Sequence, residues 1–295
     1  MPLDQFVLFG DSITQQSFSQ SPATGSFAFG AALADAYARK LDVVNRGLSG
    51  YCTVQAYRAL PLCIPEPEAV RMRFLLVFFG ANDARIAGSP GGPDQTVPLA
   101  EYKSNLRHII EHPAVQVHEG VKIILVTTPP IDERKALRAD QEKYPTLAMQ
   151  RVLRRTAANT ALYAQAARDL GEELGVPVLD IWSAMVARAG HSRHDPITPG
   201  SMEAPVNDTL QSYLHDGLHF TGEGYKVLYG ELMALIERTW PEEMPARLRM
   251  KLPAWDNGKT WVKPKADDVS GEGTLRASGV FEAVVHDVQK LDRWE

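Results

Sequence analysis

Apolar runs alternate with helical patterns along this chain, and the alternation predicts its architecture. Five short segments rich in apolar residues each predict a β-strand: 5–9, 42–45, 74–79, 121–127 and 176–180. An uninterrupted run such as Phe6-Val7-Leu8-Phe9 is typical of a strand that is buried on both faces, as in a parallel sheet. The run 74–79, which includes Phe78 and Phe79, is apolar throughout and should be central, whereas Pro177 favours an edge position for the last strand.

Segments with apolar residues at helical spacing separate these strands. They predict helices over 27–37, 53–60, 99–112, 132–143, 150–174, 181–189 and 222–240, with a further short helix over 281–294. Residues 191–207 are rich in Pro, His, Ser and Gly and predict a mobile loop. Because strands alternate with helices, we expect an α/β fold in which right-handed crossovers join a parallel sheet.

Short polar clusters follow the first three predicted strands. They are Gly10-Asp11-Ser12, Gly47-Leu48-Ser49-Gly50 and Gly80-Ala81-Asn82-Asp83. The carboxyl ends of parallel strands share one edge of the sheet, with neighbouring strands about 4.8 Å apart. We therefore expect the sheet to bring Ser12, Gly50 and Asn82 together, at the edge where open α/β folds place their chemistry.

A fourth cluster, Asp216-Gly217-Leu218-His219, offers the groups that would activate a serine. A serine hydroxyl becomes a nucleophile when a base takes its proton, and that base must be held in one tautomer. Asp216 can accept a hydrogen bond from Nδ1 of His219, which leaves Nε2 free to face Ser12. The backbone N–H groups of Ser12 and Gly50 and the side-chain amide of Asn82 are suitable donors to the oxyanion of a tetrahedral intermediate.

Other polar residues have simpler interpretations. Asp11 and Asp83 are expected to cap or stabilise turns rather than to act as general acids. The histidines His191, His194 and His215 lack the ligand spacing of a metal site, so we expect solvated loop side chains.

Composition narrows the choice of partners and compartment. The chain has 295 residues, of which 44% are hydrophobic, and a formal net charge of −5, which argues against a nucleic-acid or anionic-membrane partner. No apolar run approaches the roughly 20 residues that span a bilayer. The first strand begins almost at Met1 and leaves no room for a signal peptide. We therefore expect a cytoplasmic protein in which Cys52 and Cys63 are free thiols.

Taken together, the four clusters resemble the motifs of the SGNH, or GDSL-type, hydrolase family. The longer stretches Leu8-Phe9-Gly10-Asp11-Ser12-Ile13-Thr14, Arg46-Gly47-x-x-Gly50-Tyr51, Phe79-Gly80-Ala81-Asn82-Asp83-Ala84 and Asp216-Gly217-Leu218-His219-Phe220 are similar to its isoamyl acetate-hydrolysing esterase branch. Each motif is weak alone, but four in the same order at this spacing are specific. The resemblance covers residues 4–255, including Met250-Lys251-Leu252-x-x-Trp255.

The resemblance implies a three-layer α/β/α sandwich with a five-stranded parallel sheet, a flavodoxin-like fold. It implies Ser12 as nucleophile, His219 as base and Asp216 as the residue that orients the base. Ser12, Gly50 and Asn82 would form the oxyanion hole.

The chain is expected to divide near residue 250. We expect a hydrolase domain over 1–250 and a C-terminal extension over 251–295 that packs on the domain or trails from it. Trp255 and Trp261 are expected to cover an apolar surface rather than to line a pocket. Residues 191–207 and the tail after Lys259 are longer than this branch needs, so they bear on the substrate pocket rather than on the chemistry. Whether 191–207 covers the site is left open.

These observations predict a serine esterase that needs no cofactor or metal and forms an acyl-enzyme. Short acyl esters, acetates foremost, are the small-molecule substrates that the resemblance implies. The alternatives on the same residues are a thioesterase, a lysophospholipase or a carbohydrate deacetylase. An alternative of a different class is a non-enzymatic binding protein, whose Ser12 would resist labelling by a fluorophosphonate. The sequence leaves a homo-oligomer open.

Overall fold

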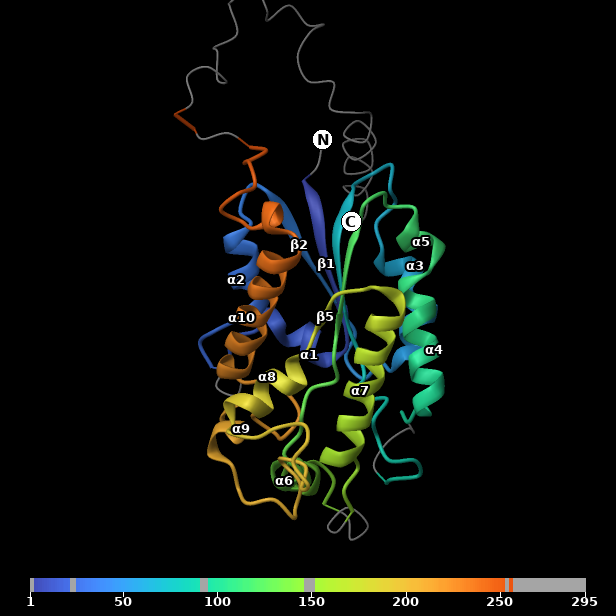
Figure 1. The fold of residues 1–295 in the computed structure, drawn as a ribbon, viewed down its shortest axis with the longest axis vertical. Helices are drawn as coiled ribbons and strands as arrows, with labels where there is room; N and C mark the ends of the chain where they lie inside the picture. Colours follow the sequence, from blue (N-terminus) through green and yellow to red (C-terminus); the bar gives the residue numbers. More distant parts are fainter. Residues whose placement is uncertain (1–2, 22–24, 91–94, 146–151, 253–254, 257–295) are drawn as a thin grey trace, which may run out of the picture. The chain divides into compact units, whose positions relative to one another are not determined.

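Five parallel strands form one sheet in the computed structural model, which describes residues 3–21, 25–90, 95–145, 152–252 and 255–256 (Figure 1). Their order is β2-β1-β3-β4-β5, so β3 is central and β5 lies at an edge, as the sequence predicted. The strands are β1 Asp4–Gly10, β2 Leu41–Gly47, β3 Met72–Phe78, β4 Lys122–Val126 and β5 Val178–Leu179.

Strand β1 contributes to a hydrophobic core on each face of the sheet. Phe6 and Leu8 belong to one core. It also contains side chains of α2 (Phe29–Ala36), α8 (Ile181–Arg188), α9 (Asp208–Tyr213) and α10 (Gly222–Thr239). Val7 and Phe9 belong to the other core. It contains side chains of α3 (Thr53–Cys63), α4 (Leu99–Ile110) and α7 (Ala157–Leu174). All four side chains are fully buried, and burial of each stabilises the fold by about 1.5–3 kcal/mol. Figure 1 shows the helices in two layers with the sheet between them, which confirms the three-layer α/β/α fold.

Most predicted helices are present with ends that differ by a few residues. Helices α2, α6, α8 and α10 fall within the predicted ranges, and α4 ends two residues earlier than predicted, before the short α5. Their bounds are α2 Phe29–Ala36, α4 Leu99–Ile110, α5 Pro113–Gln116, α6 Glu133–Lys143, α8 Ile181–Arg188 and α10 Gly222–Thr239.

Helices α3 and α7 differ from the prediction for identifiable reasons. Helix α3 (Thr53–Cys63) continues through Pro61, where we predicted its end, and the N–H of Ile64 still donates to the carbonyl oxygen of Leu60 at 3.1 Å in the last turn. Helix α7 (Ala157–Leu174) begins later than the predicted residue 150. The side chain of Thr156 accepts a hydrogen bond from the N–H of Asn159 at 3.1 Å and so caps the helix.

Five short helical segments were not predicted. The three α-helices are only one or two turns long, so their patterns are too short to be recognised in the sequence. They are α1 Ser12–Gln15, α5 Pro113–Gln116 and α9 Asp208–Tyr213, and the two 3₁₀ segments are η1 Gln16–Phe18 and η2 Pro241–Glu243.

Residues Leu3–Met250 form one compact unit. The predicted C-terminal extension stays a prediction, because Trp261 and the helix expected over 281–294 lie outside the described residues. Trp255 belongs to the second unit, which includes Lys251–Glu295, so its expected packing also stays a prediction. Within the described ranges, no helix combines the length and apolar character needed to cross a bilayer.

Candidate active site

Ser12 is the first residue of α1, directly after the turn that ends β1. Asp11 precedes it as the N-cap, and its Oδ1 accepts a hydrogen bond from the N–H of Ile13 at 2.9 Å. A Cβ on Gly10 would lie 2.0 Å from Oγ1 of Thr14, so this turn requires glycine. The tight turn holds Ser12 at the carboxyl edge of the sheet, and the predicted capping role of Asp11 is confirmed.

Gly50 and Asn82 lie beyond the ends of the two strands that flank β1. Gly10 pairs with Gly47 of β2 and with Phe78 of β3, so the chain leaves all three strands at one edge. Gly50 has a φ of +83°, a left-handed conformation that favours glycine. This edge is also the topological switch point, where the chain moves from β1 to β2 on one side and to β3 on the other.

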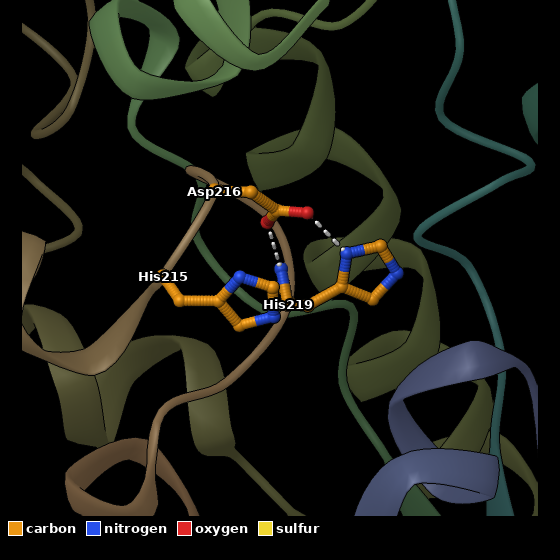
Figure 2. A group of neighbouring side chains, drawn as sticks. All are labelled: His215, Asp216 and His219. Atoms are coloured by element: carbon orange, nitrogen blue, oxygen red, sulfur yellow. Dashed lines mark hydrogen bonds and ion pairs between the residues drawn. The ribbon is translucent and has the colours of Figure 1, made fainter. Parts of the chain in front are cut away.

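His219 and Asp216 lie in the loop between α9 and α10. Nδ1 of His219 lies 2.6 Å from Oδ2 of Asp216, and Oδ1 of Asp216 accepts the backbone N–H of His219 at 2.7 Å (Figure 2). On the other side of the ring, Nε2 of His219 lies 2.8 Å from Oγ of Ser12. The structure therefore links the three residues in one hydrogen-bonded chain across the sheet edge.

A pocket of about 240 Å³ opens at Oγ of Ser12. Its wall carries cationic side chains, and no carboxylate of the described chain lines it. The lining residues are Ser12, Ser49, Gly50, Asn82, Arg85, Gln95, Lys143, Tyr144, Arg154, Arg155, Leu218 and His219. None of them comes from residues 191–207, which gives that segment no contact with the pocket in this structure.

Hydrogen bonds outweigh burial at Asp216. Burial raises the pKa of this carboxyl, but the ring and backbone N–H groups of His219 and the N–H of Leu218 together hold it well below its usual range. Asp216 is therefore ionised near neutral pH and can stabilise a protonated His219.

Two carboxyls behind the site show the opposite behaviour. Burial raises the pKa of Asp11 to about 6, although the Ile13 N–H and the charges of His219 and Arg155 oppose the shift. Burial raises the pKa of Asp83 to about 7, against the hydrogen bonds from Thr53. Neither carboxyl lines the pocket, which agrees with the structural roles that we expected.

Sequence reasoning missed the cationic wall of the pocket. Arg154 and Arg155 precede α7, whereas the predicted helix over 150–174 included them and gave them no function. Arg154 forms an ion pair with Asp140 of α6, and Arg155 contacts Asn82. Only the presence of two adjacent arginines could have drawn attention to this stretch.

The histidine next to Asp216 departs from expectation. His215 is half-buried rather than fully solvated, and its ring stacks on that of His219 with the ring centroids 5.7 Å apart (Figure 2). Candidate ligand atoms of His215, Asp216 and His219 lie within 4.8 Å of one another. A metal ion held by Nδ1 of His219 would have to replace its hydrogen bond to Asp216, so the observed geometry fits a proton-transfer pair better than a metal centre.

The structure also shows where several other side chains named in the sequence analysis lie. Phe78 and Phe79 are buried in the core. Cys52 and Cys63 are free thiols. His191 pairs with Asp195 at 2.9 Å, and neither residue lines the pocket.

Comparison with known sequences gives matches over most of the chain. The model of the GDSL-like lipase/acylhydrolase family matches residues 8–227. A GDSL esterase/lipase of Arabidopsis thaliana is 38% identical over 82% of this chain and 89% of that protein. The isoamyl acetate-hydrolyzing esterase of Saccharomyces cerevisiae is 32% identical over 86% of this chain and 95% of that protein. The human isoamyl acetate-hydrolyzing esterase 1 homolog is 33% identical over 85% of this chain and 86% of that protein.

Solved structures share the fold at lower identity. A lipase/acylhydrolase from Enterococcus faecalis has a TM-score of 0.54 at 23% identity, over 85% of this chain and 100% of that one. A mutant of an acetylxylan esterase from Geobacillus stearothermophilus has a TM-score of 0.52 at 18% identity, over 80% of this chain and 95% of that one.

Proposed function

The chain belongs to the GDSL-like lipase/acylhydrolase family and is a carboxylic ester hydrolase, and on that premise we propose that it hydrolyses short-chain esters through an acyl-enzyme on Ser12. The observation that carries the proposal is the hydrogen-bonded chain from Ser12 through His219 to Asp216, which opens into a pocket beside Gly50 and Asn82.

In the first half-reaction, Oγ of Ser12 attacks the ester carbonyl carbon while Nε2 of His219 takes the hydroxyl proton. The hydrogen bond to Asp216 keeps the other proton of the ring on Nδ1 and stabilises the imidazolium that forms. The tetrahedral intermediate then collapses, the bond to the leaving alcohol breaks, and His219 returns its proton to that alcohol.

In the second half-reaction, water takes the place of the alcohol. His219 removes a proton from the water as it attacks the acyl carbon, and then protonates Oγ of Ser12 as the acid departs. In each half-reaction His219 first accepts a proton as a general base and then donates it as a general acid. No cofactor or metal ion is required for this sequence of bond changes.

Three donors are available to the oxyanion of both intermediates. The backbone N–H groups of Ser12 and Gly50 have no acceptor among the described residues. Asn82 uses one Nδ2 hydrogen on the carbonyl of Tyr51, at 2.9 Å, which leaves the other free. Preorganised donors of this kind stabilise the transition state because they need no rearrangement as the charge develops.

The pocket favours a small acyl group. Its volume is about 240 Å³, and Leu218 is the one aliphatic side chain among its lining residues. The names of the yeast and human relatives point the same way, toward acetate esters. We therefore place short-chain acetates first among the substrates.

Hydrolysis of p-nitrophenyl acetate by wild type and Ser12→Ala tests the proposal. We expect the variant to lose on the order of 10⁶ in kcat, as is typical when a serine nucleophile is removed. A fluorophosphonate should label the wild type at Ser12 and leave the folded variant unlabelled. Equal turnover by the two proteins would refute the proposal, and a folded wild type that neither turns over nor labels would favour a binding protein.

A further inference from the structure

Arg155 is a buried guanidinium at the end of the active-site pocket. It is 8% exposed and lies in the loop just before α7. Its Nε donates to the carbonyl oxygen of Ala81 at 2.6 Å, and a terminal nitrogen donates to Oδ1 of Asn82 at 2.9 Å. Within the described chain, no carboxylate forms an ion pair with it. A buried charge without a counter-charge destabilises a fold, so its presence calls for a reason.

The contacts of Asn82 define the orientation of its side-chain amide. Oδ1 accepts from Arg155, and Nδ2 donates to the carbonyl oxygen of Tyr51 at 2.9 Å. In the flipped orientation, Nδ2 would face a guanidinium donor and Oδ1 would face a carbonyl oxygen, so both contacts would be repulsive. Only the observed orientation satisfies both neighbours, and it leaves the second Nδ2 hydrogen free beside the pocket.

We propose that Arg155 is a positioning residue for the oxyanion hole, which holds the amide of Asn82 as a donor and polarises it while negative charge develops on the substrate. This inference rests on the proposed esterase function. A cation at Oδ1 draws electron density from the amide and strengthens Nδ2–H as a donor. Because the intermediate is charged and the ester is not, the effect falls on kcat rather than on KM.

The charge that this role requires is present at neutral pH. Burial, together with the neighbouring cations Arg154 and Arg85, lowers the pKa of Arg155 to about 10, and Asp140 and Asp11 oppose the shift. The guanidinium therefore stays protonated over the range in which an esterase of this kind works.

A double-mutant cycle with Asn82 tests the inference on the full chain. We would measure kcat and KM on p-nitrophenyl acetate for Arg155→Met, Asn82→Ala and the double variant, with fluorophosphonate titration of Ser12 to count folded sites. Arg155→Met should lower kcat by on the order of 10- to 100-fold, less than the 10²–10³ typical of losing an oxyanion donor itself. In the Asn82→Ala background the same change should cost less than about threefold.

Arg155→Lys supplies a variant that keeps the charge. A lysine carries one nitrogen and cannot donate to Ala81 and Asn82 with the same fork, so we expect it to recover only part of kcat. Arg188→Gln, which removes a surface ion pair with Glu231, is the control for loss of an arginine and should leave kcat unchanged.

The outcomes separate this inference from the proposed function. An equal loss in both backgrounds, a wild-type kcat in Arg155→Met, or full recovery by Arg155→Lys would overturn the positioning role. If Ser12→Ala abolishes hydrolysis while the Arg155 variants behave in one of these ways, the esterase proposal stands and only this inference fails.

Discussion

The backbone N–H of Asp132 donates to the carbonyl oxygen of Gly217 at 3.0 Å, and so ties the loop that carries Asp216 and His219 to the first turn of α6. Gly217 has a φ of +85° at this contact. A Cβ there would lie 2.3 Å from the backbone nitrogen of Ala136. The position of His219, the proposed base, thus depends on a glycine that carries no chemistry itself.

Gly217→Ala should therefore lower both stability and kcat. The positive φ costs about 1–2 kcal/mol for a residue with a Cβ, and the clash with α6 adds to it by displacing the loop. We expect kcat on p-nitrophenyl acetate to fall at least about tenfold, because a displacement of about 1 Å at a reacting group can cost 10²-fold.

Gly175→Ala is the matched control for Gly217→Ala. Gly175 has a φ of +63° at the end of α7, but a Cβ there would meet nothing within 4 Å. It should lose about 1 kcal/mol of stability and keep its kcat. Equal kcat values for the two glycine variants would contradict the role assigned to the Gly217 contact.

Asp216→Asn should disable the base while the pocket stays intact. The amide cannot stabilise an imidazolium, and its NH₂ group favours the wrong tautomer of His219, so we expect kcat to fall by on the order of 10⁴-fold with KM nearly unchanged. Asp195→Asn is the control, because Asp195 forms a similar pair with His191 away from the pocket lining. A comparable loss in both variants would show that the effect is not specific to the site.

The residues at the carboxyl edge of the sheet could be predicted because their places follow from the pattern of apolar and polar residues alone. Apolar runs that end in polar clusters place Ser12, Gly50 and Asn82 at neighbouring strand ends whatever the details of the loops. The spacing of Asp216 and His219 on one turn adds the base. The strand-end positions follow from parallel pairing, and the spacing of Asp216 and His219 is local in the sequence. Both kinds of relation can be recognised in a single sequence.

The contacts that hold the residues at this edge in position could not be predicted in the same way. The contact between Arg155 and Asn82 joins residues 73 positions apart through a loop, and no periodicity encodes it. The N-cap at Thr156 decides that Arg155 lies outside α7, but threonine within an apolar pattern is compatible with a longer helix. The contact of Gly217 with α6 likewise depends on how two loops meet.

Acyl-chain selectivity tests the proposed preference for short acyl groups. We expect kcat/KM to fall at least about tenfold from p-nitrophenyl acetate to the octanoate, because Leu218 is the one aliphatic side chain that lines the pocket and a single methylene can change the discrimination by about 1–3 kcal/mol. Wild type should be assayed on the acetate, butyrate, hexanoate and octanoate below their aggregation limits. A rise in kcat/KM with chain length would favour the lysophospholipase alternative, and preference for acyl thioesters would favour the thioesterase.

The buried carboxyl of Asp83 should make stability depend on pH. Its Oδ1 accepts from the N–H and hydroxyl of Thr53, at 2.9 and 2.5 Å, and its Oδ2 has no partner in the described chain. Burial raises its pKa to about 7, far above the value of about 3.9 in an unfolded chain. A raised carboxyl pKa means that the folded state binds the proton more tightly, so this contribution to stability is complete below about pH 4 and is lost as pH rises to about 7.

Asp83→Asn removes that ionisation and keeps the acceptor for Thr53. Relative to wild type, the variant should gain about 1–3 kcal/mol in unfolding free energy between pH 5 and pH 8, and the gain should level off above pH 8. Urea denaturation at each pH measures the difference in unfolding free energy. The pKa of Asp11 is also raised, but Asp11 is present in both proteins, so its contribution cancels in that difference. The same change at exposed Asp35 should follow wild type at every pH. A constant difference between Asp83→Asn and wild type from pH 5 to pH 8 would mean that Asp83 does not titrate in this range in the folded protein.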